Sequence, residues 1–323
     1  TQSLANDQVN SLIEDSDGDL WMATNNGVSL YNRKQRTWRT FLSDHTFLSL
    51  CEVTPGVVWV GGYSSGLFEI NKQTGEVSNF TPSTFSGLDI RPDKYIRAML
   101  KDSKGIIWSG GLYNLKAVDR AHHSIQLFPE LSGITVLIEH DEESLWVGTN
   151  HGLFLLDKQT HQSQEVKLPV ASCSIYSLCQ SPDGRLFIGT NCAGLLIYTP
   201  STGEMVHYHT DNCALISNSI YTLICNDGQQ LLLATEGAVT YYDPATQHFT
   251  NWTREQGLST DHFNASSGIL TRDGTYVLGG TEGVLLFDHR RTLPPAPPSK
   301  LVISDLEIFY QQVNGGEANS PLT

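Results

Sequence analysis

The chain has 323 residues, of which 39% are hydrophobic and 17% are charged, and its formal net charge is −14. This composition is that of an ordinary folded protein and excludes a largely disordered one. The negative charge disfavours nucleic acids and anionic membranes as partners, because both require a basic surface.

The sequence suggests neither a membrane segment nor a zinc ribbon. No stretch approaches the roughly 18 apolar residues of a membrane helix, and no signal peptide stands at the amino end. The opening TQSLANDQVN reads like the middle of a loop, so we expect the chain to be a piece of a longer protein. The six cysteines include no CxxC pair, which argues against a zinc ribbon or a thioredoxin-type site, and most are expected to be small buried apolar residues.

The first acidic segment, EDSDGD, raises the question of a calcium loop. Asp15, Asp17 and Asp19 fit the first three ligand positions of an EF-hand. Leu20 and Asn26, however, stand where that loop requires glycine and a bidentate glutamate. The next residues, LWMAT, are apolar and aromatic and suit a strand. We interpret EDSDGD as a turn between two strands.

LWMAT is the first of seven similar strand motifs. The second residues of these motifs are Trp21, Trp59, Trp108, Trp146, Phe187, Leu232 and Val277, at spacings of 38 to 49 residues. Around each motif, short apolar runs alternate with Gly, Asp and Pro turns, which are hairpin signals. Four strands per unit, repeated seven times, predict an all-β fold, a seven-bladed β-propeller. The large ring of each second strand is expected to fill the wedge between two blades.

The seven units are expected to fill residues 1–293. In chain order they lie near residues 9–41, 47–80, 95–128, 134–168, 175–208, 220–252 and 263–293. The seventh runs from GVLLFDHRR straight into TLPPAPP, so its outer strand is expected to be absent or supplied from elsewhere, for example by residues 1–5.

Function is expected where the repeats differ, because loops on a rigid scaffold carry it. The turns after each second strand and the connections between blades fall on one face of the disc, which we call the varied face. The candidate ligand-binding residues are Asn10, Asn26, Tyr63, Arg97, Tyr113, His151, Tyr176, Tyr221, Glu236 and Asn264. Their amide, imidazole, guanidinium and aromatic groups suit a sugar-like ligand. The alternative at each position is a solvated turn residue.

One aligned position at the start of the innermost strand is expected to ring the mouth of the central channel. It reads Asn10, Leu48, Arg97, Thr135, Tyr176, Tyr221 and Asn264. Nearby, Arg91, Lys94 and Arg97 are the best candidates for a basic patch, although solvated loop charges are the simpler interpretation.

Signatures of common enzymes are absent from the sequence. It has no nucleophile elbow, HExxH motif, P-loop or Rossmann glycine pattern, so no catalytic residue, metal site or cofactor is predicted. Five acidic residues of the varied face leave a glycosidase pair open if two lie about 5 to 10 Å apart. They are Asp44, Asp93, Glu236, Asp261 and Glu282.

The repeats resemble a known family. The unit SIYSLCQSPDGRLFIGTNCAGLLIYTPSTGEMVHY, the opening SLANDQVNSLIEDSDGDLWMATNNGVSLYN and the loop GLSTDHFN are similar to the two-component regulator propeller repeat. Residues 294–323 resemble that family's Pro-rich exit into an immunoglobulin-like domain with tyrosine motifs. We therefore expect a linker there, followed by the first strand of that domain, extended from residue 301 onward, and a poorly ordered end.

The resemblance implies the periplasmic sensor region of a hybrid two-component histidine kinase, of a kind typical of gut Bacteroidetes. Such proteins detect glycan-derived oligosaccharides and control polysaccharide-utilisation genes. It also implies partners outside this chain: a second propeller, the immunoglobulin-like domain and the kinase of the same protein, and a second protomer in a homodimer. This propeller by itself is expected not to be an enzyme and not to touch the membrane. The alternatives are a propeller enzyme, such as a glycan lyase or hydrolase, and a structural propeller that only dimerises.

Overall fold

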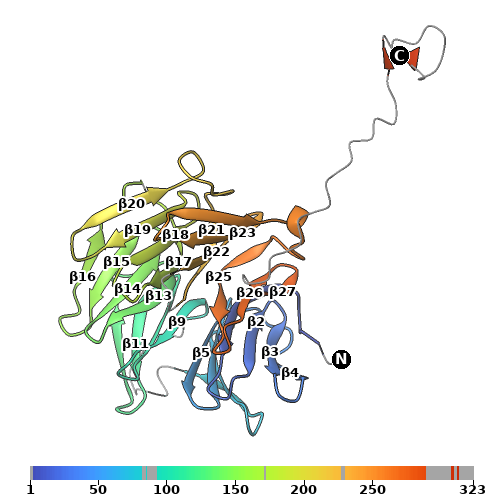
Figure 1. The fold of residues 1–323 in the computed structure, drawn as a ribbon. Coiled ribbons are helices and arrows are strands. Elements are labelled where there is room, and N and C mark those ends of the chain that lie inside the picture. The colour runs from blue at the N-terminus through green and yellow to red at the C-terminus, as the bar shows by residue number, and fades with distance from the viewer. Residues whose placement is uncertain are drawn as a thin grey trace.

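A computed structural model of the chain describes residues 3–81, 85, 93–170, 172–226, 230–288, 307–308 and 311–312. Within them, antiparallel sheets follow one another along the chain as the blades of a propeller (Figure 1). The innermost strands of successive blades contact each other in turn, and the last contacts the first. The predicted seven-bladed β-propeller is confirmed.

The strands of each blade run outward from the axis in chain order. Blades 1 to 3 are β1 (Val9–Glu14), β2 (Leu20–Thr24), β3 (Gly27–Asn32) and β4 (Thr37–Phe41); β5 (Phe47–Thr54), β6 (Val57–Gly62), β7 (Leu67–Asn71) and β8 (Val77–Phe80); and β9 (Ile96–Lys101), β10 (Ile107–Gly111), β11 (Leu115–Asp119) and β12 (Ser124–Phe128). Blades 4 and 5 are β13 (Ile134–Asp141), β14 (Ser144–Thr149), β15 (Leu153–Asp157) and β16 (Ser163–Val166); and β17 (Ile175–Gln180), β18 (Leu186–Thr190), β19 (Leu195–Thr199) and β20 (Glu204–Tyr208). Blades 6 and 7 are β21 (Ile220–Cys225), β22 (Leu231–Thr235), β23 (Ala238–Asp243) and β24 (His248–Trp252); and β25 (Phe263–Leu270), β26 (Tyr276–Gly280) and β27 (Gly283–Phe287). A 3-10 turn, η1 (Arg254–Gln256), follows β24.

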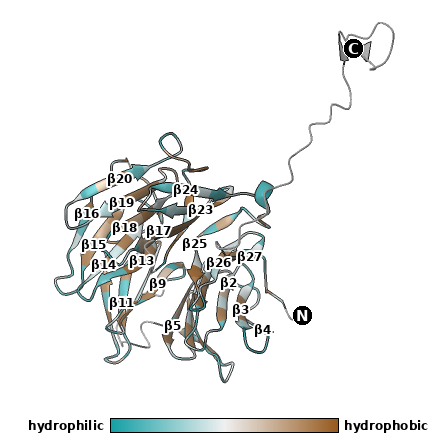
Figure 2. Cartoon of the chain, viewed as in Figure 1, coloured by the Kyte–Doolittle hydropathy of each residue, from teal (hydrophilic) through white to brown (hydrophobic). Residues whose placement is uncertain are grey.

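The core consists of apolar clusters between neighbouring blades. Each cluster contains the second-strand residue singled out by the repeat, packed against the first two strands of the next blade. Trp21, for example, packs on Leu50 and Val58, and Val277 packs on Val9 across the ring closure. Figure 2 shows the hydrophobic residues concentrated in the strands, where hydrophilic residues also occur, and the turns as largely hydrophilic. The predicted filling of the wedges is confirmed.

Blade 7 has three strands in the described part of the chain, as the sequence indicated. Residues 3–5 add no strand to it. The ring instead closes through a backbone bond of the kind that also joins other neighbouring blades. The Gly283 amide donates to the Asp7 carbonyl at 2.7 Å, as the Gly27 amide donates to the His45 carbonyl at 2.8 Å. The first and seventh blades lie side by side in Figure 1.

One expectation about the tail is wrong. β28 (Glu307–Ile308) and β29 (Gln311–Gln312) pair antiparallel, so the chain reverses there instead of forming one extended strand. Pairing satisfies backbone groups that a lone strand leaves open. The other predictions for the linker and tail lie outside the described residues. No helix in the described residues is long and apolar enough to cross a membrane.

EDSDGD is a turn, and the cation that it holds is a lysine. Asp15 is buried and accepts the Trp21 indole N–H at 2.8 Å and the Asp19 amide at 2.9 Å. Lys72 of blade 2 lies 2.7 to 2.9 Å from carboxylate oxygens of Asp15, Asp17 and Asp19. Burial alone would lower the pKa of Lys72, but its bonds to these carboxylates outweigh burial and raise it. The acidic segment therefore joins blades 1 and 2.

The same arrangement recurs between blades 3 and 4. Asp102 accepts the Trp108 indole N–H at 2.9 Å, and Lys158 contacts Asp102 at 3.2 Å and Glu139 at 2.6 Å. We call the face that carries these turns the turn face. The repeat thus encodes an ion pair between blades as well as an apolar wedge.

Blades 5 and 6 are joined at their innermost strands by a disulfide between Cys179 and Cys225. Of the other cysteines, Cys51 and Cys173 are buried, as expected, whereas Cys192 is exposed and Cys213 half-buried. Sequence spacing does not predict this pair, because the two residues lie 46 positions apart.

Candidate functional site

Exposed aromatic and apolar side chains gather on the varied face of blades 2 and 3. Tyr63 follows β6 and is 57% exposed, and Leu112 and Tyr113 follow β10 and are 54% and 59% exposed. Tyr95 stands between them, and the centroids of the Tyr95 and Tyr63 rings are 5.5 Å apart. The Tyr95 backbone packs closely on Gly111, where a Cβ atom would lie 2.2 Å from the Tyr95 carbonyl oxygen. We call Tyr63, Tyr95, Leu112 and Tyr113 the aromatic patch.

Three candidate asparagines hold the scaffold together. Asn10 donates to Asn25 and to the Phe47 carbonyl, each at 2.8 Å. Asn264 donates to the Val9 carbonyl at 2.8 Å, and Asn26 accepts the Asp44 amide at 2.8 Å. Their amides are occupied by protein partners, so these residues order the connections between blades.

His151 and Glu236 stand at exposed turn tips of blades 4 and 6. Their backbone amides bond to Thr149 and Ser219, and neither side chain makes a hydrogen bond within the described part of the chain. They are available to a ligand, but the structure does not bring them together with the aromatic patch.

The channel mouth holds the remaining candidates. Tyr176 and Tyr221 stack with ring centroids 5.8 Å apart and planes 16° apart. Arg97, on β9, donates from Nη2 to the Ala265 carbonyl at 3.0 Å. Burial lowers the pKa of Arg97 and raises that of Tyr221. Two aromatic rings and a largely buried cation therefore lie at this mouth.

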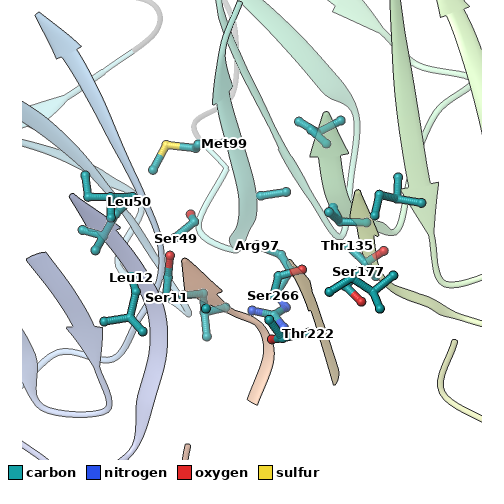
Figure 3. Close-up of a pocket in the computed structure, with 18 residues that line it drawn as sticks. Ser11, Leu12, Ser49, Leu50, Arg97, Met99, Thr135, Ser177, Thr222 and Ser266 are labelled. Atoms are coloured by element: carbon teal, nitrogen blue, oxygen red, sulfur yellow. The ribbon is translucent and has the colours of Figure 1, made fainter. Parts of the chain in front are cut away.

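A cavity of about 220 Å³ lies on the axis beside Arg97. Hydroxyl groups from several blades line it: Ser11, Ser49, Thr135, Ser177, Thr222 and Ser266 (Figure 3). Apolar side chains such as Leu50 and Met99 complete its wall. None of its lining residues is acidic.

Strand β25 bulges over this cavity. Four residues separate its paired positions Phe263 and Gly268, whereas two separate the equivalent positions Val9 and Leu12 of β1. The additional length lets the Ser266 hydroxyl reach the Tyr176 carbonyl at 2.7 Å, with Ser266 at a φ of 55°. A non-glycine residue in this left-handed region is uncommon and marks strain.

Two of the five acidic candidates converge. Asp261 and Glu282 lie near His262, with ligand atoms within 4.8 Å of one another. Arg254 bridges them, 2.5 Å from each carboxylate. Burial works to raise the pKa of Asp261, but the Arg254 bonds and charge lower it; bonds from Thr260 and Arg254 lower the pKa of Glu282. Both groups are held ionised, whereas a glycosidase acid requires a raised pKa.

Of the other charged candidates, some form ion pairs and some are exposed to solvent. Asp93 pairs with the buried Lys116 at 2.5 Å, and Lys94 is exposed. Arg91 lies outside the described residues. Within the described part, Arg97 points into the channel instead of joining a surface patch with Lys94.

Sequence reasoning missed Tyr95, Leu112 and the β25 bulge. Tyr95 precedes an innermost strand in DKYIR, where an aromatic residue among charges was a usable signal. The bulge is visible as FNASSGIL, two residues longer than the corresponding VNSLIE.

Comparison with known proteins supports the repeat assignment. The family described as "Two component regulator propeller" matches residues 3–26 and 169–192, which contain β1–β2 and β17–β18. Two segments, in blades 1 and 5, are thus similar to this repeat. It is also similar to histidine kinase P4 of Formosa agariphila, at 21% identity over 91% of this chain and 22% of that protein.

Solved structures share the propeller fold. The extracellular domain of a putative hybrid two component system from B. thetaiotaomicron superposes with a TM-score of 0.71 at 17% identity. The superposition covers 88% of this chain and 40% of the B. thetaiotaomicron chain. Streptogramin B lyase superposes with a TM-score of 0.70 at 15% identity, over 88% and 95% of the two chains. The chain thus spans less than half the length of the histidine kinase and of the extracellular domain to which it is similar.

Proposed function

We propose that this propeller is the ligand-sensing part of a hybrid two-component histidine kinase and that it lies in the periplasm. Two of its segments match the two-component regulator propeller family, and a relative at 21% identity is a histidine kinase. Ligand binding would shift the arrangement of the domains near the membrane and so bias the kinase. The disulfide Cys179–Cys225 fits this compartment, because disulfides persist in oxidising environments.

The ligand that the varied face fits best is an oligosaccharide released from a polysaccharide, whose utilisation genes the kinase would control. The aromatic patch carries this proposal. Exposed tyrosine rings on a rigid scaffold offer flat apolar area with a hydrogen-bonding hydroxyl, and sugars present an apolar face edged by hydroxyls. The further partners are the other domains of the same protein and a second protomer.

Calorimetric titration of the propeller with purified plant and host oligosaccharides tests this function. Binding by one member, lost in Tyr113→Ala and in Tyr63→Ala with unchanged melting temperature, is the expected result. Leu286→Ala, at a residue that is 64% exposed and lies outside the patch, is the matched control for loss of an exposed apolar side chain. If no member binds, or if Tyr113→Ala binds as tightly as the parent chain, the aromatic patch is not the sensor site.

A lyase or hydrolase is the second candidate, because streptogramin B lyase shares the fold and Asp261 lies close to Glu282. Arg254 bonds to both carboxylates and keeps them ionised, which disfavours acid catalysis there. Cleavage of a panel glycan, lost in Glu282→Gln, would favour the enzyme.

A further inference from the structure

The axial cavity has the properties of an anion site. Arg97 enters it from β9, and among the described residues it makes one hydrogen bond, to the Ala265 carbonyl, and no ion pair. A guanidinium carries five N–H donors, so most of the Arg97 donors have no acceptor among the described residues. Leaving a charge unpaired in a partly buried place is costly, and an anion would relieve that cost.

Most hydroxyl groups of the lining are not available to a ligand. Ser49, Thr135, Thr222 and Ser266 donate to backbone carbonyls of other blades. The Ser177 hydroxyl is buried against Gly189, away from solvent. Arg97 is therefore the group of the lining on which recognition of an anion depends.

The cavity contrasts with the rest of the molecule. The chain carries a net charge of −14, yet the cavity lining includes Arg97 and no Asp or Glu. Figure 3 shows the Arg97 side chain reaching toward Ser266 and Thr222, and Ser266 belongs to the strained bulge of β25. Strain held next to an unpaired charge is typical of a ligand site.

The size of the cavity limits the ligand. Its volume of about 220 Å³ is below the range of about 300 to 1,000 Å³ usual for drug-sized ligands. An oligosaccharide does not fit, whereas an inorganic oxyanion or a single acidic sugar does. The planar guanidinium matches the geometry of carboxylate, sulfate and phosphate groups.

We propose that the axial cavity binds one small oxyanion through Arg97, and that its occupant is the carboxylate of an acidic sugar or a free inorganic oxyanion. This deepens the proposed sensor function by assigning a chemical class to a ligand. The proposal rests on the sensor function only where it identifies the ligand as a sugar. The axial cavity is a different site from the aromatic patch.

Titration of the chain with D-glucuronate, D-glucose and sodium sulfate at constant ionic strength tests the proposal. We expect glucuronate to bind and to raise the melting temperature, and glucose to do neither. Sulfate distinguishes the sources: if it competes with glucuronate, any oxyanion fits, and if it does not, the sugar ring is also recognised. Binding of sulfate without glucuronate would assign the site to inorganic oxyanions.

Variants separate binding from folding. Arg97→Gln should weaken binding about tenfold or more, since bonds to charged groups contribute about 1.5 to 3 kcal/mol. Arg97→Lys, which keeps the charge but loses the planar guanidinium, should weaken it less. Arg39→Gln is the matched control, because Arg39 is exposed and also donates to a backbone carbonyl.

The proposal is overturned if neither anion binds, if glucose binds as well as glucuronate, or if folded Arg97→Gln keeps the parent affinity. Tyr113→Ala should leave anion binding unchanged. Failure of the oligosaccharide panel with retained glucuronate binding would therefore reject the aromatic patch alone.

Discussion

The turn face and the varied face of the propeller come from the same repeat, yet their chemistry differs. On the turn face, Asp15 and Asp102 occupy equivalent places, accept a Trp indole N–H and meet a lysine of the next blade. On the varied face, equivalent places hold Arg97 in one blade and Tyr176 in another. The chemistry repeated on the turn face holds blades together, whereas the exposed tyrosines and Arg97 of the varied face occur in single blades and are open to a ligand.

The largest expected effect is on the wedges that underlie both faces. Trp146 is 1% exposed between blades 4 and 5, and Trp146→Ala should lower the free energy of unfolding by about 3 to 5 kcal/mol. Denaturant unfolding measures this change. Exposed Tyr113→Ala should cost less than about 0.5 kcal/mol. Equal losses in the two variants would contradict the assignment of Trp146 to the core.

Removing the disulfide should have the next largest effect. Replacing Cys179 and Cys225 with serine should lower the free energy of unfolding by about 2 to 4 kcal/mol, because the bond closes a long loop in the unfolded chain. Unfolding in the presence of a reductant should abolish the difference from the parent chain. Cys192→Ser, at an exposed free cysteine, is the control and should change little.

The lysine on the turn face should contribute less. Lys72→Met leaves the buried Asp15 without its cation and should cost about 2 kcal/mol, below the value for fully buried pairs because Asp17 is exposed. Lys104→Met is the matched control, since the Lys104–Glu143 pair is exposed on both sides and should contribute little to stability. Thermal unfolding of both variants distinguishes them, and a loss for Lys72→Met no larger than the control would show that the ion pair is not stabilising.

The smallest effect is the acid dependence of the contact between blades 7 and 1. A bond from Thr271 and the contact with Arg33 lower the pKa of Asp273 to about 2. Because the pKa is lowered in the folded state, this stabilisation is complete above about pH 4 and is lost as the pH falls toward 2. Asp273 is half exposed, so the contribution should be below about 1 kcal/mol. The difference in unfolding free energy between the parent chain and Asp273→Asn should shrink between pH 4 and 2; a constant difference would contradict it.

The sequence predicted the parts of the molecule that recur and missed those that occur once. The spacing of Trp21 and its equivalents predicted the blades and the apolar packing between them, because each unit must bury the same interface. Asp15 was assigned correctly to a turn, but its partner Lys72 lies 57 residues away and became visible only in three dimensions. Asn10 and Asn264 looked like ligand contacts, yet they bond to neighbouring blades, because a side-chain amide serves a backbone carbonyl as readily as a sugar. Among the candidates, Tyr63 and Tyr113 are exposed as a ligand site requires.

The division between the faces is tested most directly by measuring unfolding free energy and oligosaccharide affinity together for Lys72→Met and Tyr113→Ala. The account predicts a crossed result: Lys72→Met loses stability and keeps the affinity of the parent chain, whereas Tyr113→Ala keeps stability and loses at least tenfold in affinity. If Tyr113→Ala loses stability and affinity in proportion, or if Lys72→Met alone loses affinity while remaining folded, the separation of a structural face from a ligand-binding face is wrong.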